Sequence, residues 1–253
     1  MCEDLAFLQA ILANPDDTVT ISAYTDWLID RDDVRGEFLS IESKRDVKSP
    51  AIIQRVEELR GKLPSWWLAI LGRIRATEST PDLARIQDVA QRLGRAVEFV
   101  DPDGYQRTIT AAATSDFTDT LAYVECVSQW RDVFHDINYY LRLHGQDGRV
   151  VSSEIQSYNP FFGCGVRLLE WFGHEVIFIY REKHRTYLCR LALDSAAEFR
   201  EIADDWVING RQVGFAGYRD KRVRRLLLPS LEELSTLSEA EANSLELMPR
   251  EHL

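Results

Sequence analysis

The sequence predicts an α+β protein, with an all-helical N-terminal module followed by an antiparallel-sheet domain with flanking helices. Apolar residues in the first part of the chain recur at intervals of three and four, which is typical of helices. From about residue 96, short runs rich in β-branched and aromatic residues alternate with turn sequences, which is typical of antiparallel strands. The length of 253 residues exceeds one average domain, so we expect two domains, at residues 1–76 and 81–253.

The helical module is predicted from a series of apolar faces separated by helix-breaking sequences. The first face ends at Asn14-Pro15, a sequence that breaks helices. Ser49-Pro50 and Pro64 are expected to begin the last two helices, because proline is tolerated in the first helical turn. The faces expected to be buried are Leu5, Leu8, Ile11 and Leu12; Ile21, Tyr24, Trp27 and Leu28; Phe38 and Ile41; Ile52, Val56 and Leu59; and Trp67, Ile70, Leu71 and Ile74.

The second domain is expected to start with a helix after a short polar linker. Thr80-Pro81 has the form of a cap and a first turn, and Gly94 suits the left-handed residue that ends a helix. A strand at residues 97–100 is followed by a turn sequence at 101–104. Residues 117–143 carry apolar side chains at spacings of three and four, so we predict that they are helical, in one or two pieces.

Residues 150–228 are predicted to form an antiparallel meander. Its first four strands are expected at residues 150–157, 166–172, 176–180 and 186–193. Asn209-Gly210 is a typical hairpin turn, and the run at 223–228 is expected to be one of two closing strands.

Three Ser-x-x-Glu sequences have the form of a capping box, in which the serine and the glutamate satisfy backbone N–H groups at a helix start. They lie at residues 195–198, 230–233 and 238–241. The first is expected to begin a helix that carries Phe199, Ile202 and Trp206. The other two are expected to begin short helices in an acidic tail.

The charge balance bears on the class of partner. The net charge is −11, whereas nucleic-acid-binding proteins usually present a basic face to phosphate, so the balance argues against DNA, RNA and anionic membranes. The sequence opens without the basic start and apolar run of a secretory signal, and no apolar run approaches the length of a membrane span. We therefore expect a cytoplasmic protein that is not in a membrane.

The N-terminal segment resembles a known bacterial family. Residues 7–17 read FLQAILANPDD, and residues 24–38 read YTDWLIDRDDVRGEF. This pattern resembles the bacterial repeat-companion domain over residues 5–45, although Thr25 replaces the usual alanine and residues 18–22 lack the usual Pro-Arg-Leu. The resemblance implies no catalytic motif. It implies a module that joins an attached domain to a protein partner.

Three aspartates of this segment are candidate protein-binding residues. Asp26, Asp30 and Asp33 fall at spacings of four and three, which places them on one side of a helix. They are interpreted either as a docking face for a basic partner or as a solvated helix face with caps.

A basic run is the one local reversal of the acidic charge. On a strand, Arg222 and Arg224 share one face, while Lys221, Val223 and Arg225 share the other. The arginines Arg222, Arg224 and Arg225 are candidate contacts for an acidic protein surface or a phosphate backbone. The alternative is that they pair with carboxylates of the acidic tail.

Catalytic and cofactor motifs are weak or missing. The four cysteines form no C-x-x-C pair, no histidine spacing is typical of a metal site, and no phosphate-binding glycine loop is present. Neither a metal nor a cofactor is therefore predicted. Cys164, in Gly163-Cys164-Gly165, has His174 and His184 on nearby predicted turns, which is compatible with a nucleophilic dyad or with a structural loop.

Three functions follow from these observations. The first is a non-catalytic protein-binding adaptor or regulatory subunit of a bacterial multi-protein system, for example in defence or regulated proteolysis. The second is an immunity-like inhibitor that neutralises a basic toxin or nuclease with its acidic surface. The third is a cysteine-dependent enzyme that uses Cys164. The partner's identity and the oligomeric state are left open.

Overall fold

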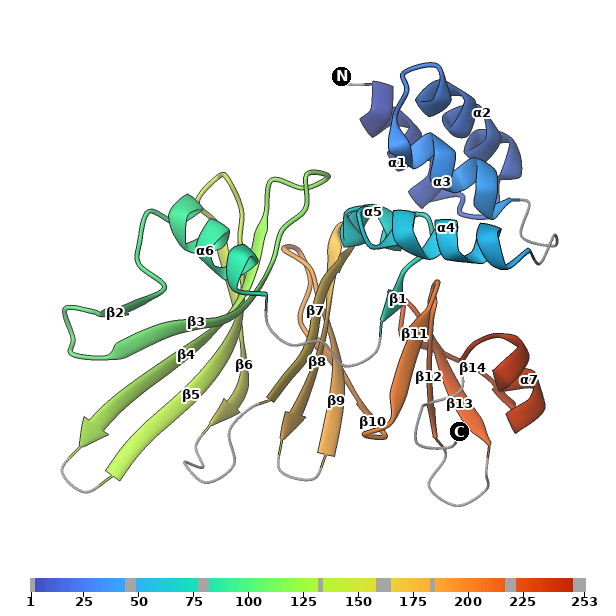
Figure 1. Ribbon diagram of the computed structural model, residues 1–253. Helices are drawn as coiled ribbons and strands as arrows, with labels where there is room; N and C mark the ends of the chain where they lie inside the picture. The colour runs from blue at the N-terminus through green and yellow to red at the C-terminus, as the bar shows by residue number, and fades with distance from the viewer. Residues whose placement is uncertain are drawn as a thin grey trace. The chain divides into compact units, whose positions relative to one another are not determined.

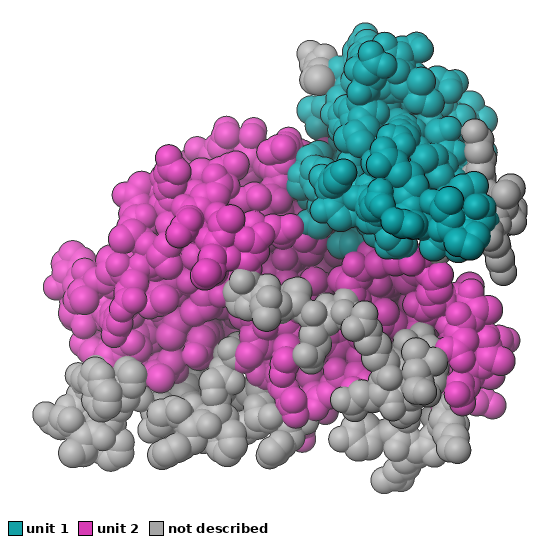
Figure 2. All heavy atoms as spheres, in the orientation of Figure 1, with its two compact units in different colours: residues 1–74 teal, residues 75–253 magenta. Residues whose placement is uncertain are grey.

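A computed structural model describes residues 3–43, 49–76, 82–131, 134–157, 165–182, 185–216 and 222–247 of the chain. These residues combine α-helices with antiparallel sheets, which confirms the predicted α+β class. The chain divides into two compact units, Met1–Ile74 and Arg75–Leu253, which we call the helical unit and the sheet unit (Figure 2).

The helical unit is built from short helices (Figure 1), and residues of their predicted apolar faces form its core. The helices are α1 (Glu3–Ala13), α2 (Thr18–Ile29), α3 (Val34–Glu42), α4 (Pro50–Arg60) and α5 (Ser65–Ile70). Residues that are at most 5% exposed include Leu8, Ile11, Tyr24, Leu28, Phe38, Val56, Leu59, Trp67, Ile70, Leu71 and Ile74. Leu5, Leu12, Ile21, Trp27, Ile41 and Ile52, which the same faces contain, are half-buried.

Local polar contacts fix where these helices begin. Asp17 caps α2, because its carboxylate accepts a hydrogen bond from the Val19 backbone N–H at 3.0 Å. Ser49 precedes α4 as expected, but its side chain makes no capping bond, and Pro50 occupies the first turn. The start of α4 therefore depends on the fixed φ of Pro50, without a capping hydrogen bond from the Ser49 side chain.

Helices α2 and α3 approach each other closely at Gly36. A Cβ atom at this position would lie 2.8 Å from the backbone nitrogen of Ile29 and 3.0 Å from the Cβ of Leu28. No other residue type fits without moving one helix, so the glycine of the Arg-Gly-Glu-Phe stretch is explained by packing.

The sheet unit contains three antiparallel sheets in its described residues, and consecutive strands pair as neighbours. The first sheet contains β2 (Glu98–Val100), β3 (Gln106–Ala113), β4 (Leu121–Arg131), β5 (Phe134–His144) and β6 (Val150–Ser157). The second contains β7 (Gly165–Phe172), β8 (Glu175–Glu182), β9 (Arg185–Leu191) and β10 (Glu198–Ile202). The third contains β11 (Trp206–Asn209), β12 (Gln212–Ala216), β13 (Val223–Leu227) and β14 (Glu232–Leu237), with β1 (Arg75–Ala76) beside β11.

Strand β8 of the second sheet is buried on both faces. Strand β8 runs through five consecutive residues, 176–180, that are each at most 3% exposed. Alternate side chains of a strand point to opposite faces, so both faces must be covered. Contacts with the first sheet supply part of this cover, because Trp171 Nε1 donates to the Ala113 carbonyl at 3.1 Å and Tyr180 donates to the Ile155 carbonyl at 3.4 Å.

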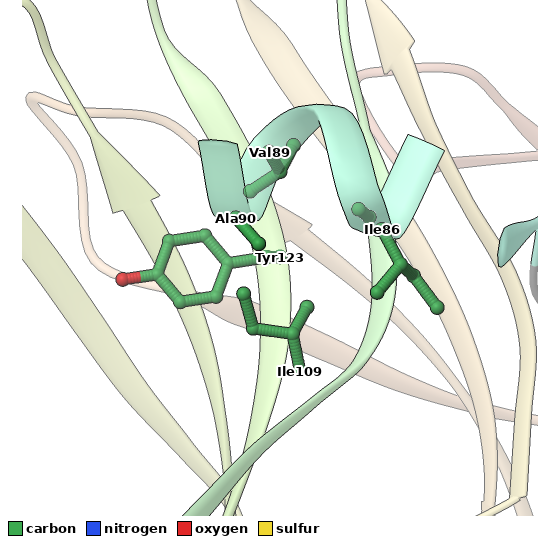
Figure 3. Close-up of a cluster of buried hydrophobic side chains, with 6 residues drawn as sticks. Ile86, Val89, Ala90, Ile109 and Tyr123 are labelled. Carbon is green, nitrogen blue, oxygen red and sulfur yellow. The ribbon is translucent and has the colours of Figure 1, made fainter. Parts of the chain in front are cut away.

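Helix α6 (Leu83–Arg92) packs on the first sheet. Its Ile86, Val89 and Ala90 meet Ile109 of β3 and Tyr123 of β4 in one buried cluster (Figure 3). The helix ends as predicted at Gly94, whose φ is 65°. Its cap, however, is Asp82 and not Thr80, because the Asp82 carboxylate accepts from the Ala84 backbone N–H at 2.9 Å. Thr80 and Pro81 lie outside the described residues.

A buried carboxylate joins several strands of the first sheet. Glu125 of β4 is 1% exposed, and its oxygens lie 2.7 Å from Arg95, 3.1 Å from Arg107 and 2.7 Å from Arg142. A buried charge is tolerated when it is paired in this way. The cluster is therefore explained by the stability of the sheet.

The prediction of helix over residues 117–143 was wrong, because this segment forms strands β4 and β5. The spacing of three and four arises because β4 has buried side chains on both faces, among them Tyr123, Val124 and Glu125. A strand that is covered on both faces does not show strict alternation. The β-branched and aromatic residues of the segment were the better signal.

The meander was predicted only in part. Residues 166–172, 176–180 and 186–193 correspond to the consecutive strands β7, β8 and β9, but residues 150–157 form β6, which pairs with β5 in the first sheet. The Asn209-Gly210 turn joins β11 and β12 as expected, and the residue with positive φ is Gly210.

Two of the three predicted capping boxes were wrong. Residues 198–202 form strand β10, where Glu198 reaches Arg190 on β9 at 2.7 Å. Ser230 lies in the turn between β13 and β14, and Leu231 beside it has a φ of 58°, which does not continue into a helix. The third is confirmed, since Ser238 and Glu241 form a full capping box on α7 (Glu239–Ser244).

Within the described residues, no helix is both long enough and apolar enough to span a membrane.

Candidate protein-binding site

Residues of the family-like motif form a polar network inside the helical unit. Arg35 of α3 lies at its centre, with Nη2 at 2.7 Å from Asp33 and Nη1 at 3.1 Å from Asp4 of α1. Tyr24 of α2 donates to Asp4 at 2.5 Å and accepts from the indole N–H of Trp67 at 3.0 Å. The network therefore ties helices α1, α2, α3 and α5 together.

The network shifts the ionisation of its members. Hydrogen bonds from Arg35 lower the pKa of Asp33 below its ordinary value. Burial, together with the hydrogen bond to Asp4, raises the pKa of Tyr24 well above its ordinary value. The tyrosine therefore stays neutral as a donor, and the low pKa of Asp33 keeps that carboxylate charged.

The three predicted aspartates are placed in two different environments. Asp33 caps α3 through the Arg35 backbone N–H at 2.9 Å and also pairs with the Arg35 side chain, so its carboxylate is engaged in structure. Asp26 and Asp30 are exposed, and within the described residues neither has an ion pair. The exposed part of the predicted stripe is therefore Asp26 and Asp30.

Asp32 is a further acidic residue that the sequence reasoning missed. It has a φ of 52°, and it follows α2 at the position where glycine is usual, because the backbone N–H groups of Asp32 and Asp33 bond to the carbonyls of Ile29 and Leu28, both at 3.0 Å. Its side chain is exposed and carries no ion pair within the described residues. The acidic run Asp30-Arg31-Asp32-Asp33 contains this residue. A search for aspartates at helical spacing does not find it, because Asp32 lies in the turn between the two helices.

A groove lies beside this turn, between α2 and α3. It has a volume of about 410 Å³. Its lining residues are Ile29, Asp32, Asp33, Val34, Glu37, Ser40 and Ile41. Ile29 is 45% exposed and Val34 is 43% exposed, so apolar surface is presented directly beside the unpaired carboxylate of Asp32. The sequence suggested Ile41 as a core residue, and the structure places it at the wall of the groove.

The negative charge of the chain is concentrated in this region. Residues 1–43 contain ten aspartates and glutamates but only two arginines, a formal charge of −8 against −11 for the whole chain. Glu3, Asp4, Asp33, Glu37 and Glu42 have arginine partners. Among the described residues, the carboxylates left without an ion pair include Asp32, which lines the groove, and the exposed Asp26 and Asp30, on α2 and at its C-terminal end.

Two arginines of the predicted basic run make contacts within the sheet unit. Arg224 pairs with Glu233 of β14 at 2.8 Å and stacks on the ring of Phe215. Arg225 donates to the Ser235 carbonyl at 2.9 Å and to Gln212 at 2.9 Å. Arg222 is exposed. Arg224 therefore matches the alternative in which the arginines pair with carboxylates of the acidic tail, whereas Arg225 bonds to uncharged groups. Lys221 lies outside the described residues.

The described cysteines are not suited to nucleophilic chemistry. Burial raises the pKa of the Cys189 thiol to about 12, and burial also raises that of Cys126. Cys164 and His184 lie outside the described residues, whereas His174 is exposed with its ring 4.9 Å from that of Phe117. Among the residues that the structure describes, no group of three or more His, Cys, Asp or Glu residues could hold a metal ion.

Comparison of the chain with protein-family models, with curated proteins and with solved structures gives no match.

Proposed function

We propose that this protein is a non-catalytic adaptor whose helical unit binds a basic segment of another protein in the groove between α2 and α3. One observation carries the proposal. Exposed apolar side chains, Ile29 and Val34, line the groove together with Asp32, which has no ion pair among the described residues, in the most acidic part of the chain. The resemblance to a companion module supports the same class of function.

The chemistry of the groove indicates the kind of segment that it accepts. An apolar side chain of the partner is buried between Ile29, Val34 and Ile41, which removes hydrophobic surface from water. Lysine or arginine side chains beside this anchor pair with Asp32, which lines the groove, and with Asp30, which is exposed and follows Ile29 in the chain. Interfaces commonly combine one buried apolar anchor with charged contacts that select the partner.

The test compares two double variants of equal charge. The tagged full chain is incubated with extract of its source cells, as wild type, as Asp30→Asn/Asp32→Asn and as Asp116→Asn/Asp119→Asn. Asparagine tolerates the left-handed conformation at position 32, so the groove variant keeps its fold. Asp116 and Asp119 are exposed aspartates of the sheet unit and provide the control.

We expect a protein partner that co-elutes in stoichiometric amount with the wild type and the control. Its affinity for the purified groove variant should fall about tenfold or more, because two charged contacts are lost. No stoichiometric partner, or a partner bound equally by all three proteins, contradicts the proposal.

The same experiment distinguishes the adaptor from the immunity-like inhibitor, which the formal charge of −8 in residues 1–43 also favours. If the partner is a basic enzyme whose activity is abolished on binding, the protein is an inhibitor. If the partner keeps its activity and bridges to further proteins, the protein is an adaptor.

A further inference from the structure

The groove between α2 and α3 is lined by carboxylates that are held in different ways. Asp32 has no ion pair among the described residues. Asp33 is bound by Arg35 at 2.7 Å, whereas Glu37 is bound by a residue of helix α4. We propose that this residue, Arg55, is a built-in competitor of the basic segment: it occupies Glu37 in the unbound protein and is displaced by an arginine or lysine of the segment. The inference rests on the proposed function and adds how the groove selects its partner.

The contact between Arg55 and Glu37 has the form in which an arginine of a partner binds a carboxylate. Nε of Arg55 donates to one carboxylate oxygen of Glu37 at 2.8 Å, and Nη2 donates to the other at 2.9 Å. These hydrogen bonds lower the pKa of the Glu37 carboxyl below its ordinary value, so the group is ionised at neutral pH. An incoming cation therefore finds the right charge at Glu37 but must take the place of Arg55.

The pair is exposed enough to exchange with a partner. The side chains of Arg55 and Glu37 are 41% and 42% exposed, and ion pairs in contact with water contribute little to stability. The pair at Asp33 is different, because the Arg35 side chain is only 18% exposed and also binds Asp4. Breaking that pair would leave a partly buried charge without its partners. Of the two carboxylates, Glu37 is therefore the one that a partner can capture.

Arg55 has a second carboxylate within reach when it leaves Glu37. Glu58 lies about one turn further along α4, and its Oε2 is 3.5 Å from Nη1 of Arg55. Gln54 of the same helix donates to the other oxygen of Glu58 at 2.9 Å, which helps to fix the position of that carboxylate. The displaced Arg55 therefore keeps an ion pair within its own helix, so its release costs less than the loss of an isolated pair.

The competitor makes the groove selective for a segment that carries a cation at the right place. A segment that offers only an apolar anchor leaves Arg55 on Glu37 and gains the hydrophobic contact alone. A segment whose cation reaches Glu37 gains a second carboxylate besides Asp32. Because an arginine can reproduce the two-point contact and a lysine cannot, we expect arginine at this position of the segment. Discrimination then comes from the cost of displacing an internal group.

The test is a double-mutant cycle measured with a synthetic peptide, acetyl-Lys-Arg-Leu-Arg-Lys-amide, which carries one apolar residue between cations. Its affinity for the isotope-labelled full chain is measured by NMR titration, which also shows which backbone amides it shifts. The proteins compared are wild type, Arg55→Gln, Glu37→Gln and the double variant. We expect Arg55→Gln to bind the peptide about threefold more tightly than the wild type does. In the Glu37→Gln background the same change should gain less than about 1.5-fold, because it releases no carboxylate there.

Arg31→Gln is the charge-matched control. It removes a cation from the same unit and releases Glu3, which does not line the groove, so it should gain less than about 1.5-fold. No gain in Arg55→Gln, an equal gain with and without Glu37, or an equal gain in Arg31→Gln would overturn the proposal. Failure of the groove itself is recognised separately. The peptide would then shift no amide of residues 29–41, or would bind Asp30→Asn/Asp32→Asn as tightly as wild type, and both proposals would be wrong.

Discussion

At Gly36, the absence of one methyl group allows α2 and α3 to come together. The adjacent Arg35 then joins Asp33 and Asp4, and Phe38 is buried against Trp67 with ring centroids 6.1 Å apart. The residues of the Arg-Gly-Glu-Phe stretch are therefore explained by the stability of the helical unit. The residues available to a partner are the exposed ones beside them.

Replacing Gly36 with alanine should destabilise the helical unit by about 1–3 kcal/mol, because the new Cβ overlaps the backbone of Ile29. Gly61→Ala is the matched control, since its nearest atom is the Glu57 carbonyl oxygen at 3.6 Å and its φ is −65°. We expect the control to be neutral or slightly stabilising in urea unfolding. Equal effects of the two substitutions would contradict the packing argument.

Asp33 makes the stability of the helical unit depend on pH. Its pKa is lowered in the folded state by Arg35, so its contribution is present above its unfolded value of about 3.9 and is lost as pH falls through the folded value. Urea midpoints of wild type and Asp33→Asn should differ at pH 7 and converge below about pH 3. All other acidic groups are common to both proteins, so their titration does not affect the comparison. A difference in urea midpoint that stays constant at all pH values would contradict a link between Asp33 ionisation and stability.

At the scale of the element, the turn between α2 and α3 both connects the two helices and places a charged residue at the proposed binding groove. Asp32 occupies a left-handed position at which glycine is preferred, and its charged side chain faces the groove. Residues at functional sites often retain such locally unfavourable conformations.

Asp32→Gly should therefore stabilise the helical unit by about 0.5 kcal/mol and weaken the binding of the partner. Asp32→Asn removes the charge but tolerates the conformation, so it should weaken binding with little change in stability. Chemical denaturation and affinity measurements on both variants separate the two effects. A glycine variant that is less stable than the wild type would show that the aspartate is there for the turn.

The local sequence predicts some elements and not others for physical reasons. The capping box at Ser238 is confirmed, whereas Ser195-x-x-Glu198 precedes a strand, because Glu198 finds Arg190 across the sheet. A four-residue pattern cannot report this long-range partner. The candidate site was predicted in part for the same reason: Asp26 and Asp30 are visible as a stripe, but an exposed Ile29 has the same sequence signature as a core residue.

At the scale of the whole molecule, charge is distributed unevenly. Residues 1–43 account for −8 of the net charge of −11, so the long-range attraction of a basic partner is directed to this part of the chain. Such attraction acts mainly on the rate of association.

The affinity for the partner should consequently fall about tenfold or more between 0.05 and 0.5 M salt, since the screening length drops over this range. The Asp30→Asn/Asp32→Asn variant should show a shallower dependence, and Asp116→Asn/Asp119→Asn the same dependence as wild type. Surface plasmon resonance at several salt concentrations gives both rates. An affinity that does not respond to salt would show that apolar contact alone drives binding.

The burial of β8 on both faces has a consequence for how the protein opens. Its backbone amides bond to β7 on one side and β9 on the other, so they exchange hydrogen for deuterium only when several strands separate at once. Strand β10, at the edge of the same sheet and largely exposed, can fray alone. In native-state hydrogen exchange, residues 176–180 should therefore be among the last amides of the sheet unit to exchange, and their rate becomes an internal gauge of its free energy of unfolding.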